Sequence, residues 1–466
     1  MNATSRRRAH AVLPVAGVVG TLGIATVGLR VAGIAIPWFV LTTSGSAAQT
    51  GLVVAAELAP YVLTKAVGGP LVDRLGQRRV SIVADLLSAA LFALIPLLHH
   101  LGALPLSTLL VIVAVAGALR GPGDAAKHTM APLVARHAGV PLTRVTGLVS
   151  AVERSGGLIG PALAAFLITV AGPPLTVAVT AACFALSAGV VAICVPAAVA
   201  GPQGAAGPQA AAEPQGAEAQ VRGDSYLTQL REGWQFLLRD RLLLGLALMI
   251  AVTNLLDVAK VSVLLPVWAD QGGHGIAAIG LLLTCLAGAQ VLTGALASWL
   301  GDRLPRRATY FVAFAIAGPP PFLVLGLDAS LGVVVVTYVI SGLASGFLNP
   351  MLGAIIFERI PEPMLGRVTA PVDALAWAGM PLGGLAAAAL VTGFGLSPAL
   401  LICAAVYALA VVLPAVGNHA SFDSPPPLPA SPPPPLSAPP PPAPPLEQPR
   451  PDSPLEQRPG SPLRTI

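Results

Sequence analysis

Charge is scarce in this chain of 466 residues, because only 10% of them are Asp, Glu, Lys or Arg. A soluble domain carries about 25%. Hydrophobic residues make up 55% of the chain and the mean hydropathy is +0.78, so we expect most of it to lie in lipid. Lysine is rarest, with Lys65, Lys127 and Lys260 as the whole set, and abundant Ala, Gly, Pro and Arg indicate a bacterial genome of high GC content.

Cysteine is also scarce, and all four cysteines lie inside apolar segments at unrelated spacings: Cys183, Cys194, Cys285 and Cys403. We expect them to act as small hydrophobic residues, not as metal ligands or a disulfide framework. No nucleophile, metal-ligand cluster or cofactor loop is evident, so we predict no enzymatic activity and no cofactor. The basic residues form short clusters between apolar runs, which argues against nucleic acid as a partner despite an isoelectric point near 9.3.

Twelve apolar runs have the length that a bilayer requires, about 20 residues for a core of about 30 Å. They lie near 12–41, 50–72, 79–98, 104–126, 145–170, 175–197, 242–268, 276–300, 308–327, 330–352, 367–392 and 397–417. The sequence therefore predicts an all-α polytopic membrane protein with twelve transmembrane helices.

The loops between these runs fall into two sets. One set carries Lys or Arg throughout, at Arg6–Arg8, Arg74, Arg78, Arg79, Lys127, Arg136, Arg144, Arg231, Arg239, Arg241, Arg303, Arg306, Arg307, Arg359 and Arg367. The other set has none, at 42–49, 99–104, 171–174, 269–275, 328–329 and 393–396. This distribution follows the positive-inside rule, so we expect both termini in the cytoplasm and the chain in the bacterial inner membrane.

The two halves of the chain repeat each other. A shift of 229 residues brings Asp73-Arg74 onto Asp302-Arg303, and a shift of 223 brings Gly160 onto Gly383. Such offsets indicate two six-helix bundles related by an axis along the membrane normal. The expected division is an N-terminus (1–11), a first bundle (12–197), a cytoplasmic linker (198–241), a second bundle (242–417) and a Pro-rich disordered tail (418–466). Within the linker, residues 225–241 indicate an amphipathic helix on the inner membrane surface.

The loop after the second apolar run reads GPLVDRLGQRR, from Gly69 to Arg79. It resembles the signature G-x-L-a-D-r-x-G-r-r of the major facilitator superfamily. The matching residues are Gly69, Asp73, Arg74, Gly76 and Arg78, with a degenerate second-half copy at Asp302 and Arg303. The resemblance implies a cytoplasmic gate in which Asp73 meets the start of helix 11 near Arg367, because a helix N-terminus favours an anion. We assign Asp85 to the same network because it lies near this loop.

The fifth run contains Gly156, Gly160 and Pro161 in the order GGLIGPALAA, which is similar to an element of proton-coupled exporters. Glycines four residues apart let helices approach closely, and proline bends a helix. The stretches PWFVLTTSGSAAQTGLV, LREGWQFLLRD and IPEPMLGRVTA resemble the branch that holds macrolide-efflux and enterobactin-export proteins. The resemblance covers roughly residues 12–417. It implies a monomeric transporter that moves a small-molecule substrate across the lipid bilayer and draws energy from the proton gradient.

Polar residues inside the apolar runs are the candidates for a substrate and proton cavity, because charge at membrane depth is costly and usually faces a cavity or a partner. They are Arg30, Glu57, Tyr61, Lys65, Arg120, Glu153, Asn254, Asp257, Lys260 and Asp373. Counting residues from the run edges places three pairs at matching depths: Arg30 with Glu57, Arg120 with Glu153, and Lys65 with Asp373.

We expect a secondary active transporter that exports small amphipathic or lipophilic compounds by proton-coupled alternating access. Uptake, or export of a defined metabolite such as a siderophore or a lysophospholipid, remains an alternative within transport. A membrane sensor without transport activity is the alternative from another class.

Overall fold

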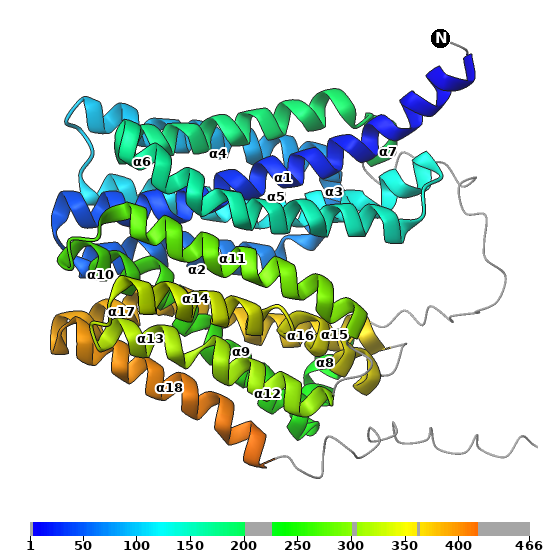
Figure 1. Cartoon of the computed structure of the whole chain (residues 1–466). Coiled ribbons are helices and arrows are strands. Elements are labelled where there is room, and N and C mark those ends of the chain that lie inside the picture. The colour runs from blue at the N-terminus through cyan, green and yellow to red at the C-terminus, as the bar shows by residue number, and fades with distance from the viewer. Residues whose placement is uncertain (1–2, 201–225, 301–304, 361–363, 418–466) are drawn as a thin grey trace, which may run out of the picture. The chain divides into compact units, whose positions relative to one another are not determined.

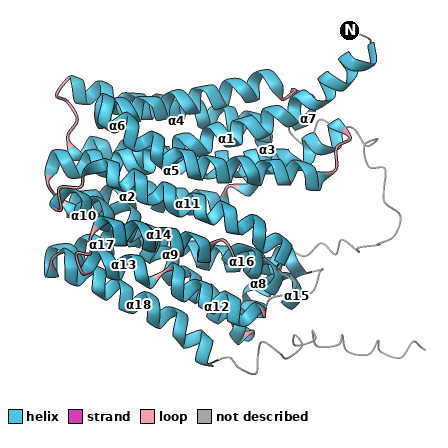
Figure 2. Ribbon diagram, in the orientation of Figure 1, coloured by secondary structure: helices cyan, strands magenta, loops and turns pink. Residues whose placement is uncertain are grey.

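The computed structural model describes residues 3–200, 226–300, 305–360 and 364–417. Every regular element in those residues is a helix (Figure 2). This confirms the prediction of an all-α polytopic fold. All of these helices belong to one compact unit.

The first half contains seven helices (Figure 1). They are α1 (Ala3–Ser44), α2 (Ala47–Val67), α3 (Gly69–Leu75), α4 (Gln77–His100), α5 (Leu106–Ala138), α6 (Leu142–Cys194) and the short α7 (Ala197–Ala200).

The second half begins with α8 (Tyr226–Arg239) and α9 (Arg241–Ala259), and α9 runs through the π-helical turn η1 (Lys260–Leu264) into α10 (Leu265–Gln271). The remaining helices are α11 (Gly275–Leu300), α12 (Arg306–Ala317), α13 (Pro319–Gly326), α14 (Leu331–Ser345), α15 (Leu348–Arg359), α16 (Leu365–Ala378), α17 (Met380–Phe394) and α18 (Leu396–Gly417).

Within the described residues, 11 helical stretches are long and apolar enough to cross a membrane. One of them, α6, has 53 residues and reverses direction at Gly172, whose φ of 78° and ψ of 164° are not helical. Glycine adopts such a positive φ without a steric penalty, and the two prolines that follow favour the start of a new helix. The stretch therefore contains two spans, and the total is the twelve that the sequence predicts.

Several spans of the second half are interrupted near their middle. The breaks fall at Gly318 between α12 and α13, at Gly346 between α14 and α15, and at Gly379 between α16 and α17. Proline follows within two residues at the first and third breaks, and it removes a helical hydrogen bond. Neighbouring helices of a bundle can satisfy the freed backbone groups.

The two halves meet mainly through α2 with α17 and α6 with α11 (Figure 1). A Cβ atom on Gly51 would lie 2.3 Å from the Gly384 carbonyl oxygen, and one on Gly280 would lie 2.3 Å from the Ala165 Cβ atom. These close contacts lie toward the end of the bundle whose turns carry no arginine, called here the arginine-free end. The other end carries the turns with Arg74, Arg136 and Arg144 and is called the arginine-rich end.

A buried polar network lies inside the first half. The Lys127 ammonium is 2.6 Å from the Asp85 carboxylate, and the Ser187 hydroxyl donates to the same carboxylate at 2.6 Å. Ser187 also contacts the Thr21 hydroxyl, so the network joins α1, α4, α5 and α6. The placement of Lys127 in a loop was therefore wrong. The apolar run ends near residue 126, but α5 continues to Ala138, and the Asp85 carboxylate offsets the cost of burying Lys127 within it.

Helix α8 packs on the protein. Its Leu237 is fully buried in a cluster with Val368 and Val372 of α16. The Glu232 carboxylate lies 2.8 Å from the Arg367 guanidinium, and a Cβ atom on Gly233 would overlap the Arg367 carbonyl oxygen. This part of the apolar face of α8 therefore packs against α9 and α16 of the same half. The expected position of the helix on the inner membrane surface stays a prediction.

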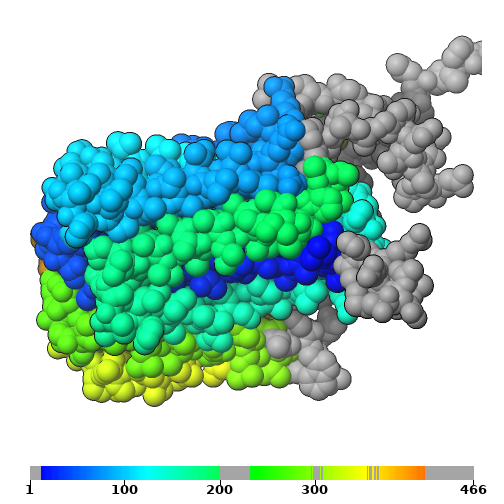
Figure 3. Space-filling model, turned by 90° about the horizontal axis from the view of Figure 1, so that it is seen from above, coloured from blue at the N-terminus to red at the C-terminus, as the bar shows by residue number. Residues whose placement is uncertain are grey.

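Large apolar side chains cover much of the outside. Phe166 is 62% exposed, Val170 70% and Ile193 82%. In Figure 3 the face turned to the viewer is formed mostly by segments before residue 200, which include α4 and α6. Such an exterior would be unfavourable in water and suits contact with lipid.

Candidate functional site

A buried ion pair near the middle of the spans joins Glu57 of α2 to Arg120 of α5. The Arg120 Nη1 atom donates to the Glu57 carboxylate at 2.5 Å, and the side chain of Arg120 is 4% exposed and that of Glu57 12% exposed. The Arg120 guanidinium also lies over the Tyr61 ring, 5.0 Å from its centroid. Both groups of such a pair can stay charged inside a bundle, because their mutual attraction offsets the free energy of removing each charge from water.

Two glycines of α5 bring α2 close enough for this pair. A Cβ atom on Gly117 would lie 2.1 Å from the Glu57 carbonyl oxygen, and one on Gly121 would lie 2.3 Å from the Thr64 hydroxyl oxygen. Glycines four residues apart form a shallow groove on a helix, and a second helix can lie in it. Glu57 therefore faces Arg120 across a very short gap.

Two of the pairs expected from depth were wrong. Arg30 does not pair with Glu57, and Arg120 does not pair with Glu153, because Glu57 binds Arg120. Glu153 instead lies 3.4 Å from the Nε2 atom of His128. The depth count failed because helices continue beyond their apolar runs, as α5 does to Ala138, so run edges do not mark membrane depth.

An aromatic and cationic cluster joins the halves next to this pair. The Lys65 ammonium lies 3.9 Å from the centroid of the Trp377 indole on α16 and donates to the Tyr61 hydroxyl at 3.2 Å. The rings of Tyr61 and Trp377 are stacked at 6.4 Å with an interplanar angle of 24°. Asp373 and Asp124 act on Lys65 electrostatically, but neither forms an ion pair with it within 4 Å. The expected contact of Lys65 with Asp373 therefore stays a prediction.

Three polar residues of the seventh span lie where it changes to a π-helical turn. The Lys260 ammonium is 2.7 Å from the Asp257 carboxylate and 5.0 Å from the Phe322 ring centroid. Asn254 donates its amide to the Ala376 carbonyl of α16 at 3.0 Å. The Lys260 side chain is buried, whereas that of Asp257 is 46% exposed. π-Helical turns inside α-helices are often found at functional sites.

A polar cavity of about 290 Å³ lies between the two halves. Its charged lining residues are Arg30 of α1 and Glu153 and Arg154 of α6, and the second half adds Gln290 of α11 and Asn349 of α15. Glu153 acts on Arg30 electrostatically. The structure thus brings Arg30 and Glu153 to one cavity, although the depth count paired them with other residues.

The exporter-type residues of α6 pack against α1 and α11. A Cβ atom on Gly156 would lie 2.8 Å from the Thr26 Cγ2 atom, and one on Gly160 would lie 2.4 Å from the Arg30 Cβ atom. The Pro161 carbonyl is close to Gly280 of α11. Gly160 therefore leaves room for the Arg30 side chain at the edge of the polar cavity.

The gating segment forms α3 and the turn after it. Gly76 has a φ of 86°, which favours glycine at this turn. Arg78 donates to the Val195 and Ala192 carbonyl oxygens at 2.6 and 2.8 Å and so caps the end of α6. Asp73 is exposed and forms no ion pair with another described residue. Of the remaining residues of this set, Gly69 and Arg74 are also exposed, and Asp302 and Arg303 lie outside the described residues.

Asp85 lies apart from this segment. Its carboxylate is held inside the first half by Lys127 and Ser187, and it is 2% exposed. Its assignment to the gating network is therefore not supported by a contact, because the side chain points into the bundle and not toward the loop.

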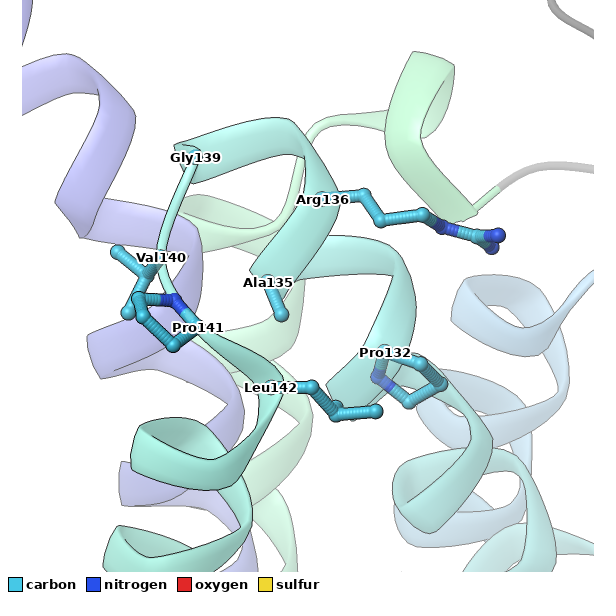
Figure 4. A pocket seen from close by; sticks show the side chains of 7 residues that line it. All are labelled: Pro132, Ala135, Arg136, Gly139, Val140, Pro141 and Leu142. Carbon is cyan, nitrogen blue, oxygen red and sulfur yellow. The ribbon is translucent and has the colours of Figure 1, made fainter. Parts of the chain in front are cut away.

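A second cavity, of about 430 Å³, lies at the turn between α5 and α6 (Figure 4). Its lining is mostly apolar, and the side chain of Arg136 extends away from Val140 and Pro141. It contains none of the polar residues described above. The described residues hold no cluster of three His, Cys, Asp or Glu side chains that could bind a metal ion.

Comparison with known proteins places this architecture in a family. The family model for the Major Facilitator Superfamily matches residues 18–278 and again residues 249–457. The chain belongs to the major facilitator superfamily. It is therefore a secondary transporter of that superfamily and a multi-pass membrane protein.

Two relatives and two solved structures show how this superfamily member compares with others. The Multidrug efflux pump Tap of Mycobacterium tuberculosis is 32% identical over 377 residues, which are 80% of this chain and 86% of the relative. The pump of the same name from Mycolicibacterium fortuitum is 29% identical over 367 residues, 78% of this chain and 85% of the relative. The nucleoside transporter NupG has a TM-score of 0.66 at 13% identity, over 89% of this chain and 99% of its own. A bacterial homolog of the human lysosomal transporter Spinster has a TM-score of 0.62 at 14% identity, over 89% of this chain and 94% of its own.

Sequence reasoning did not select several residues that the structure places beside the candidate residues: Asp124, Arg154, Gln290, Asn349 and Trp377. The glycine pair Gly117 and Gly121, on either side of Arg120, is a signal that could have indicated the pairing of α5 with α2.

Proposed function

We propose that this transporter exports small amphipathic or lipophilic compounds in exchange for protons. The observation that carries the proposal is the 32% identity to a relative named a multidrug efflux pump, across 86% of that relative's length. Gly156, Gly160 and Pro161 support it, because they resemble an element of proton-coupled exporters. They lie on α6, where it packs against α1 and α11.

Glu57 is the first candidate for the proton carrier, followed by Asp257, Asp373 and Glu153. A proton that binds the Glu57 carboxylate neutralises it and removes its attraction for Arg120, which keeps its own charge. When the proton leaves, the ion pair forms again. Arg120 contacts Tyr61, and Tyr61 contacts Lys65 and Trp377. A movement of Arg120 on proton binding would therefore change the packing at the interface of the two halves.

The segment from Gly69 to Gly76 is proposed as the gate on the cytoplasmic side. The exposed Asp73 is free to approach the second half when the arginine-rich ends of the halves come together. We also infer that the protein lies in the bacterial inner membrane with both termini in the cytoplasm, since the arginine-bearing turns fall on one side of the predicted membrane. We expect it to act as a monomer.

Inverted membrane vesicles with an acidic interior test the proposal. Export appears there as accumulation of substrate, and a panel of acidic, neutral and basic amphipathic dyes covers the substrate class. We expect accumulation that collapses when the pH gradient is abolished. Glu57→Gln should lower the pH-driven rate at least about tenfold, which corresponds to about 1.4 kcal/mol, while Asp270→Asn, an exposed acid at the arginine-free end, should leave it unchanged.

The same vesicles separate the alternatives. Dye loss on acidification would indicate uptake as the physiological direction. Binding of a dye without any gradient-driven movement would indicate a sensor, and accumulation of one metabolite alone would indicate a dedicated exporter.

A further inference from the structure

The polar cavity between the halves contains more positive than negative charge. Arg30 and Arg154 face it with one acid, Glu153, whose closest partner is His128 at 3.4 Å. Neither arginine forms an ion pair within 4 Å with any residue that the structure describes. Both arginines are exposed to the cavity, and a guanidinium at membrane depth usually faces a cavity or an anionic partner, so two of them beside one acid point to an anionic ligand.

Glycines leave the space that the side chains of both arginines occupy at the cavity. A Cβ atom on Gly160 would lie 2.4 Å from the Arg30 Cβ atom, and one on Gly294 of α11 would lie 3.0 Å from the Arg154 Nη1 atom. A larger residue at position 160 would collide with the base of the Arg30 side chain, and one at position 294 would crowd the Arg154 guanidinium. Arg154 is thus held against α11, across the interface between the halves.

The second half adds neutral hydrogen-bonding groups to the same space. Gln290 and Asn349 supply amide donors, and Ala287 and Val291 supply an apolar wall. Guanidinium groups present their donors in a planar fork that matches the two oxygens of a carboxylate. The volume of about 290 Å³ is near the lower limit for small-molecule sites, so it suits an anionic group with a small apolar body.

We propose that this cavity binds the anionic oxygen group of the transported compound, with Arg30 and Arg154 on one side and Gln290 and Asn349 on the other. The inference names a substrate class within the proposed function and rests on transport between the halves, but not on its direction or on protons. A ligand held by both halves would be released when the halves separate around the cavity.

Three probes that share one ring system test the proposal: 1-naphthoate, 1-naphthamide and 1-naphthylmethylammonium. Isothermal titration calorimetry of the purified full chain in detergent should show saturable binding of naphthoate. The amide should bind at least about tenfold more weakly, since a hydrogen bond to a charged group contributes about 1.5–3 kcal/mol. The ammonium probe should not bind to this cavity.

Variants then locate the binding. Arg154→Gln should weaken naphthoate binding at least about tenfold without a change for the amide. Glu153→Gln should strengthen naphthoate binding, because it removes the acid of the cavity. Arg144→Gln is the matched control, since Arg144 is an exposed arginine of the same helix outside the cavity. If Arg154→Gln does not fold, Asn349→Ala provides the test from the second half.

Equal binding of the three probes, or unchanged naphthoate affinity in both Arg154→Gln and Asn349→Ala, would overturn the proposal. These results are independent of proton coupling. A chain that binds naphthoate selectively but shows no pH-driven flux would keep the anion site and reject the proposed export. A chain that exports dyes but binds the three probes equally would keep the proposed export and reject the anion site.

Discussion

Tyr61 is in contact with two cations at once. Arg120 lies over its ring and Lys65 donates to its hydroxyl group. Each cation has a second partner, since Arg120 pairs with Glu57 and Lys65 lies over Trp377. A change at Glu57 therefore alters the neighbours of Lys65 through a short chain of direct contacts. Such a chain links the first half to α16 of the second.

Lys65 has two candidate partners on α16, one turn apart. It now lies over Trp377, and Asp373 is four residues earlier, about 6 Å along the helix axis. We expect the ammonium to move to the Asp373 carboxylate when the arginine-rich end closes. Neutralising Lys65 or Asp373 alone should then impair export more than neutralising both, and the exchange of the two charges should restore part of the rate.

The measurement is the export rate in vesicles at matched protein level. A fully buried pair that loses one partner costs about 3–5 kcal/mol, and these side chains are only partly buried, so we expect a smaller effect. The coupling energy from the double-mutant cycle should still exceed about 0.5 kcal/mol. Strictly additive losses, with no recovery in the exchanged variant, would show that the two residues act separately.

At the scale of single elements, α6 is the helix whose small residues matter most. Gly160 leaves room for Arg30, and Gly156 leaves room for Thr26. Gly160→Ala should force α1 and α6 apart or displace Arg30, at a cost of about 1–3 kcal/mol. We expect a lower melting temperature and a lower export rate.

Gly147→Ala on the same helix is the control, because a Cβ atom there would meet nothing within 4 Å. It should leave export unchanged and keep or raise the melting temperature, since alanine favours a helix more than glycine does. If the two alanine variants behaved alike, the effect would lie in helix propensity and not in the contact with Arg30.

The sequence was sufficient to locate the spans, but not to predict the breaks within them or the contacts between them. Apolar runs of about 20 residues located every span, including the hairpin that the structure places at Gly172. Which acid meets which base depends on helix rotation and tilt, so Glu57 was paired with Arg30 and not with Arg120. The burial of Lys127 could not be predicted either, because it depends on Asp85, 42 residues away along the chain.

For the molecule as a whole, the distribution of arginine predicts its orientation. Reporter fusions at Gly45 and Gly273 should be extracytoplasmic, because the turns there carry no Lys or Arg. A fusion at Gln215, in the linker between the halves, should be cytoplasmic. A cytoplasmic signal from Gly273 would contradict the arrangement of six spans on each side of the linker.

Two close approaches of the halves lie toward the arginine-free end, at Gly51 with Gly384 and at Gly280 with Ala165. Alternating access by rocking of the two halves requires these contacts to separate once in each cycle. Glycine at Gly51 and Gly384 allows the two backbones to meet almost directly. We therefore expect this contact to be a closed gate in the present conformation, and not a permanent joint.

A disulfide across this contact tests that expectation. The Val54 Cβ atom lies 3.3 Å from the position that a Cβ atom on Gly384 would take, close to the about 3.5–4.5 Å of natural disulfides. In a chain whose four native cysteines are replaced by serine, Val54→Cys with Gly384→Cys should still export when reduced, at a lower rate than the parent, because a Cβ atom at position 384 would lie 3.0 Å from the Gly51 carbonyl oxygen. Oxidation should stop export, and dithiothreitol should restore it, because the locked halves can no longer part. Each single cysteine variant should be insensitive to oxidation. Undiminished export by a sample whose disulfide is verified by mass spectrometry would mean that α2 and α17 stay together throughout the cycle.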